Sequence, residues 1–116
     1  VKWVEIFNEF TSPVLDVSGL EEYRKYFWQK QLHLFEVPFY YIEYGIAQLG
    51  AIGLWKQFKE NKEQALNNYI TALALGGTRT LPELFRSAGL HFDFSPAVVG
   101  NLMSFIHSEM QSLTKK

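Results

Sequence analysis

Hydrophobic positions recur at intervals of three and four along most of the chain, as they do on one face of an α-helix. This spacing predicts six helices, over residues 1–10, 18–33, 39–59, 61–75, 80–89 and 95–116. Apart from a marginal stretch at residues 91–94, no segment alternates with the period of two that a half-buried strand requires. The pattern therefore predicts an all-α fold, a bundle of about five to six helices in one domain over residues 1–116.

Capping signals predict where several of these helices begin and end. Residues 18–21 and 80–83 read Ser-x-x-Glu and Thr-x-x-Glu, the pattern of a capping box, in which the hydroxyl and the carboxylate each accept from a free backbone N–H. Asn61 and Ser95 are suitable N-caps for the fourth and last helices, and Pro96 favours the first turn of the last one. Two consecutive glycines, Gly76 and Gly77, are expected to end the fourth helix.

The helix predicted over residues 39–59 carries little side-chain bulk. Gly45, Gly50 and Gly53 lie within it, and each glycine costs a helix roughly 1 kcal/mol relative to alanine. Their accumulation suggests that another backbone or a ligand approaches this face closely. One hypothesis is therefore a non-catalytic helical module that binds a partner helix or forms a homo-oligomer through the small residues.

Charge and composition exclude several classes of function. Eleven Lys and Arg against twelve Asp and Glu give a net charge of -1, so no basic field favours nucleic acid or an anionic membrane. The most apolar run, residues 40–55, is interrupted by Glu43 and Gln48 and is shorter than the roughly 20 residues of a membrane span. The chain has no cysteine and no recognisable signal peptide, which fits a cytoplasmic protein.

One stretch around Pro38 contains several side chains that could take part in catalysis or binding. They are the imidazole of His33 and the phenols of Tyr40, Tyr41 and Tyr44. Pro38 predicts a bend, and tyrosines three and four residues apart at the start of the following helix can turn their hydroxyls to one side. Aromatic residues at helical spacing are usually packed rings with hydrogen-bonded hydroxyls, and the lining of a small-molecule pocket is a third interpretation. The sequence at this point leaves three interpretations open: a chemical role, packed aromatic rings and a small-molecule pocket.

The chain contains no metal-binding motif. Its three histidines, His33, His91 and His107, are not arranged as His-Glu-x-x-His, the helical zinc motif of many metallopeptidases. We therefore expect no metal ligand in this chain.

Two segments resemble a known family of peptidases. The stretch from His33 to Gln48, HLFEVPFYYIEYGIAQ, resembles the segment that follows the metal site in oligoendopeptidase F, a member of the thimet oligopeptidase family. Residues 76–90 resemble the C-terminal Gly-Gly-Ser/Thr segment of that family, and Ser95-Pro96 opens the last helix as expected. The likeness covers nearly the whole chain in the family's order.

The resemblance implies that residues 1–116 are the C-terminal portion of a larger helical metallopeptidase catalytic domain. In such an enzyme an upstream His-Glu-x-x-His helix and a later Glu hold zinc, and none of these residues is in this chain. By similarity His33, Tyr41 and Tyr44 match the substrate-side His and Tyr residues of the family, with Tyr40 beside them.

The resemblance also implies a role for each of these groups. We expect Tyr44 and His33 to be catalytic, with Tyr44 as the leading donor to the oxyanion, and Tyr41 and Tyr40 to bind substrate. The expected partners are a short peptide and the rest of the peptidase, whether an upstream segment or another chain. Without base or metal, this polypeptide alone is expected to be inactive.

Overall fold

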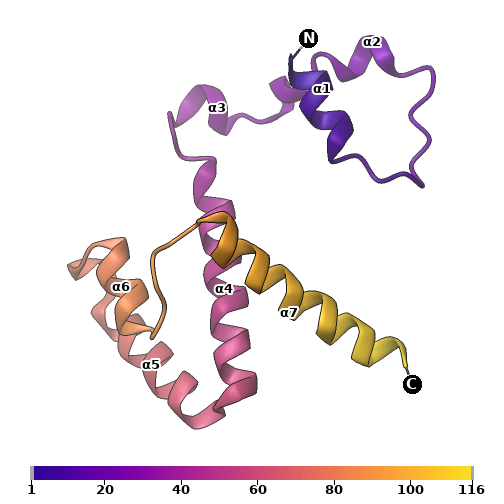
Figure 1. Ribbon diagram of the computed structural model, residues 1–116. Coiled ribbons are helices and arrows are strands. Elements are labelled where there is room, and N and C mark those ends of the chain that lie inside the picture. The colour runs from indigo at the N-terminus through magenta and orange to yellow at the C-terminus, as the bar shows by residue number, and fades with distance from the viewer. Residues whose placement is uncertain (1, 116) are drawn as a thin grey trace. The chain divides into compact units, whose positions relative to one another are not determined.

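The computed structural model describes residues 2–115 and confirms the all-α fold. In this part of the chain there are seven α-helices, two short 3₁₀ helices and no strand (Figure 1). In chain order the elements are α1 (Lys2–Glu9), α2 (Glu21–Arg24), η1 (Phe27–Lys30), α3 (His33–Glu36), α4 (Ile42–Glu60), α5 (Lys62–Leu75), η2 (Gly76–Thr78), α6 (Leu81–Ser87) and α7 (Pro96–Thr114). The predicted helix ends at Val1 and Lys116 lie outside the described residues.

The chain forms two compact units, Val1–Ile42 and Glu43–Lys116. The first unit contains α1, α2, η1 and α3, and the second contains α4 from Glu43 onward, α5, η2, α6 and α7. Of the candidate site residues, His33, Tyr40 and Tyr41 belong to the first unit and Tyr44 to the second.

In the first unit, the single helix predicted over residues 18–33 is wrong, because two short helices, α2 and η1, lie in this region and a third, α3, begins at His33. The predicted capping box is also wrong. The Ser18 hydroxyl donates to the Asp16 carboxylate at 2.6 Å, Glu21 accepts from the Gly19 backbone N–H at 3.1 Å, and Leu20 is the N-cap of α2 without a side-chain bond.

A contact with α1 accounts for the end of α2. The indole N–H of Trp3 donates to the backbone carbonyl of Arg24 at 3.2 Å, which gives a partner to one of the free carbonyls at the end of α2. The ring of Phe7 also lies 5.9 Å from that of Phe27. Packing against α1 thus replaces further α-helical turns in a segment rich in aromatic residues, which are only moderate helix formers.

Helix α4 begins at Ile42, so the predicted start at residue 39 is wrong. The bend predicted at Pro38 is present, and within it the N–H of Tyr40 donates to the Val37 carbonyl at 3.2 Å. Phe39 has a φ of 63°, a left-handed conformation that an α-helix cannot contain. Tyr40 and Tyr41 consequently lie in a turn before α4, and only Tyr44 lies on the helix.

In the second unit the predicted caps are confirmed. Asn61 accepts from the Gln64 backbone N–H at 3.1 Å at the start of α5, and Gly76, with φ 52°, ends that helix. Thr80 and Glu83 form the capping box of α6. Ser95 caps α7, with its hydroxyl oxygen 3.5 Å from the Val98 nitrogen.

The small residues of α4 allow the close approach that the sequence predicts. A Cβ on Gly50 would lie 3.1 Å from the ring of Phe85, and one on Gly53 would lie 2.9 Å from a methyl group of Leu90. A Cβ on Gly45 would meet nothing within 4 Å. Close approach is therefore found only at the later two glycines, where it is made by side chains and not by the backbone or ligand that the sequence predicts. Helix α6 and the residues that follow it therefore pack on the middle of α4.

Helix α7 contacts α4 through two side-chain pairs. The rings of Trp55 and Phe105 meet edge to face at 5.0 Å, and Lys59 forms an ion pair with Glu109 at 2.8 Å. Within residues 2–115, no helix is both long enough and apolar enough to cross a membrane.

Candidate functional site

Three of the four predicted site residues are brought together in the first unit. His33 is the first residue of the short helix α3, and the turn after Pro38 brings Tyr40 and Tyr41 back to it. The rings of His33 and Tyr40 stack nearly parallel, with centroids 5.9 Å apart and planes 6° apart. The ring of Tyr41 lies 5.8 Å from His33 and is tilted by 50°. The structure thus groups His33 with Tyr40 and Tyr41, whereas the resemblance matches His33 with Tyr41 and Tyr44.

These side chains are partly open to solvent. His33 is half-buried, and Tyr40 and Tyr41 are 38% and 43% exposed. Tyr44, in the first turn of α4 in the second unit, is 51% exposed. Each of these tyrosines is therefore accessible to solvent over part of its surface.

Sequence reasoning missed Phe39, which lies in the same turn. It combines a positive φ of 63° with a side chain that is 97% exposed. Pro38 signals a bend but not its handedness, and a left-handed phenylalanine has no sequence signature because glycine or asparagine normally occupies such positions. Only the backbone conformation of Phe39 in the structure distinguishes this residue.

The described residues do not by themselves fit a zinc site. Zinc is held in proteins by three or four Cys, His, Asp or Glu side chains, and no group of three such residues within 2–115 is placed to hold a metal ion. His33 belongs to α3, His91 to the segment before α7, and His107 to α7, where its Nε2 lies 2.9 Å from the Gln111 side-chain nitrogen.

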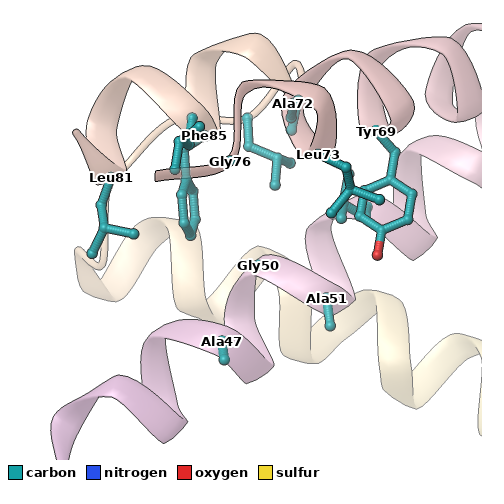
Figure 2. A pocket seen from close by; sticks show the side chains of 13 residues that line it. Ala47, Gly50, Ala51, Tyr69, Ala72, Leu73, Gly76, Leu81 and Phe85 are labelled. Atoms are coloured by element: carbon teal, nitrogen blue, oxygen red, sulfur yellow. The ribbon is translucent and has the colours of Figure 1, made fainter. Parts of the chain in front are cut away.

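A cavity of about 400 Å³ lies in the second unit between α4, α5 and α6. Figure 2 shows Tyr69, Ala72 and Leu73 of α5 and Leu81 and Phe85 of α6 around the small residues of α4. Its lining is almost entirely apolar, and none of the four candidate site residues is part of it. This cavity therefore suits packing of apolar groups rather than acid–base chemistry.

Most of the chain matches a known family. The family model described as Peptidase family M3 matches residues 2–103, which places the protein among peptidase-related hydrolases. The chain belongs to peptidase family M3, the thimet oligopeptidase family, whose full-length members are metallopeptidases. Neither the curated proteins nor the solved structures gave a match.

Proposed function

We propose that this chain supplies the substrate side of the active site in a zinc-dependent oligoendopeptidase that hydrolyses short peptides. The observation that carries the proposal is the contact of His33 with Tyr40 and Tyr41, in a chain that belongs to a metallopeptidase family. Peptide substrates are therefore the proposed partners. The absence of cysteine fits a cytoplasmic enzyme.

The roles of the four residues follow from the chemistry of peptide hydrolysis. Attack on a peptide carbonyl places negative charge on its oxygen, and a positioned O–H or N–H donor stabilises that charge more than it stabilises the substrate. We assign this role to the phenol of Tyr44, with His33 supporting the transition state. Tyr41 and Tyr40 bind the substrate backbone.

The zinc ligands in this proposal lie outside the present sequence, in an upstream segment or on another chain. The family supplies the reason to expect zinc, while residues 2–115 contain no group of ligands placed to hold it. The 116-residue chain alone is therefore expected not to hydrolyse peptides. Zinc-dependent turnover by this purified chain would contradict the proposed division of the site.

The alternative, a helical interaction or oligomerisation module, receives less support from the packing. It depends on the small-residue face of α4 being available to a partner, yet Gly50 and Gly53 are approached by Phe85 and Leu90 of the same chain. Of the three glycines on that face, only Gly45 has no neighbouring atom within 4 Å of an added Cβ. Homo-oligomerisation through the remainder of the surface stays a secondary proposal.

The direct test is Tyr44→Phe in the complete peptidase. Loss of one oxyanion donor typically lowers kcat by about 10²- to 10³-fold, and KM should change little because the ring is retained. Tyr23→Phe is the matched control, since Tyr23 is a 73% exposed tyrosine on α2, outside the proposed site. An unchanged kcat in Tyr44→Phe would refute the assignment of the oxyanion donor.

A further inference from the structure

Phe39 has an unfavourable backbone conformation and an almost fully exposed ring. Among residues 2–115 it is the only residue other than glycine with a positive φ, at 63°. For a bulky L-residue this conformation brings Cβ close to the following carbonyl oxygen, so such residues rarely adopt it.

Packing does not offset this strain within the described structure. The Phe39 side chain is 97% exposed, the largest value among the exposed hydrophobic residues of the described chain. Its neighbours His33, Tyr40 and Tyr41 are all substantially more covered. A strained backbone that presents an apolar ring to solvent is unfavourable for stability alone, and strained residues of this kind occur at ligand clamps and active sites.

The position of the ring in the chain indicates what it contacts. Phe39 directly precedes Tyr40 and Tyr41, whose rings pack against His33. A peptide bound by these polar groups through its backbone would carry its own side chains to either side. An exposed phenyl ring in the same turn has no hydrogen-bonding atom and a large apolar surface, so an apolar side chain of the peptide is the partner that its chemistry favours.

We propose that Phe39 is a specificity-determining residue whose ring binds an apolar side chain of the peptide substrate. This inference rests on the proposed function of the His33, Tyr40, Tyr41 and Tyr44 group. It adds a preference for substrates with an aliphatic or aromatic residue at one position near the cleaved bond. The left-handed backbone at Phe39 keeps the ring exposed for this contact.

The test is Phe39→Gly in the complete peptidase, because glycine tolerates a positive φ and removes the ring. Two series of peptides are assayed. One series places Phe, and the other places Ala, at each position near the cleaved bond in turn. Wild type should prefer Phe over Ala at one position, and Phe39→Gly should lower that preference in kcat/KM by about 10-fold, the usual effect of one apolar contact. The melting temperature should rise, since the strain is relieved.

Phe10→Gly is the matched control, because Phe10 is 83% exposed in the same unit but lies in the turn after α1. It should leave the substrate preference unchanged. An active Phe39→Gly enzyme with wild-type preference at every position would overturn the inference. A lower melting temperature with unchanged preference would instead assign the ring to packing within the full enzyme, and also overturn it. Absence of peptide hydrolysis by wild type would show that the proposed function itself is wrong.

Discussion

At the scale of single residues, Gly89 shows how one position determines a local path of the chain. It ends α6 with a φ of 76°, and its carbonyl accepts from the Gln57 side-chain amide of α4 at 2.6 Å. A Cβ at this position would lie 2.7 Å from the Asn68 amide nitrogen of α5. The glycine therefore allows the turn after α6 to sit against both α4 and α5.

Gly89→Ala should lower the free energy of unfolding by about 1–3 kcal/mol. The strain of a left-handed alanine is about 1–2 kcal/mol, and displacement of Gln57 or Asn68 adds the loss of a hydrogen bond. Gly45→Ala is the control, because its Cβ would meet nothing within 4 Å and alanine is the better helix former. Thermal unfolding should show a decrease for Gly89→Ala and an increase for Gly45→Ala. Equal effects would contradict the packing described here.

At the scale of helices, local signals were predictable and tertiary contacts were not. The caps at Asn61, Thr80 and Ser95 were predicted because each depends on residues three or four positions away. The division of residues 18–33 was not predicted, because it depends on the bond from Trp3 to the distant Arg24 carbonyl.

The geometry of the candidate site, like the division of residues 18–33, could not be predicted from the sequence. Its four polar residues were identified by resemblance to the peptidase family. The turn that places Tyr40 and Tyr41 beside His33 required the unusual φ of Phe39, which the sequence does not reveal.

The capping box of α6 should make this helix sensitive to acid. The Glu83 carboxylate accepts from the Thr80 hydroxyl at 2.7 Å and from the Thr80 N–H at 2.9 Å. These two bonds hold the pKa of Glu83 below its usual value, and the bond from the hydroxyl has a larger effect than the bond from the backbone N–H. A lowered folded-state pKa means that the stabilisation is present above the unfolded-state pKa, about 4.3 for Glu, and is lost as pH falls through the lower folded-state value.

Glu83→Gln should remove this pH dependence, since glutamine can accept the same bonds but does not titrate. Hydrogen exchange of the α6 amides reports the effect at that helix. In wild type, exchange corrected for intrinsic rates should accelerate as the pH falls below about 4.3, and in Glu83→Gln this step should be absent. Identical acid profiles for the two proteins would show that the carboxylate does not stabilise α6.

At the scale of the whole molecule, the helices leave large apolar side chains uncovered. Only Gly53, Ala65 and Ala88 are buried within residues 2–115, and no large side chain is fully buried. On α5, Ile70 and Leu73 are 61% and 60% exposed. Contiguous apolar surface of this kind normally marks an interface, and the proposed function assigns it to the rest of the peptidase.

The 116-residue chain alone should therefore self-associate. Light scattering at increasing protein concentration should show a rising average mass, because burial of apolar surface drives association. Ile70→Lys combined with Leu73→Lys should reduce the association, whereas Lys substitutions at the exposed polar positions Asn67 and Thr71 of α5 should not. A monomer that unfolds cooperatively would favour a free-standing module.

The central claim is that this chain is one part of a peptidase site whose metal ligands lie outside residues 1–116, with an upstream segment of the same polypeptide as the first source to test. The most direct measurement is the sequence of the coding DNA upstream of the Val1 codon, translated in frame. The account predicts an in-frame His-Glu-x-x-His followed by a later Glu, which are the ligands and base that residues 2–115 do not assemble. A start codon immediately before Val1 would contradict the account, and would leave the His33 to Tyr44 segment as a binding surface without a catalytic partner in its own chain.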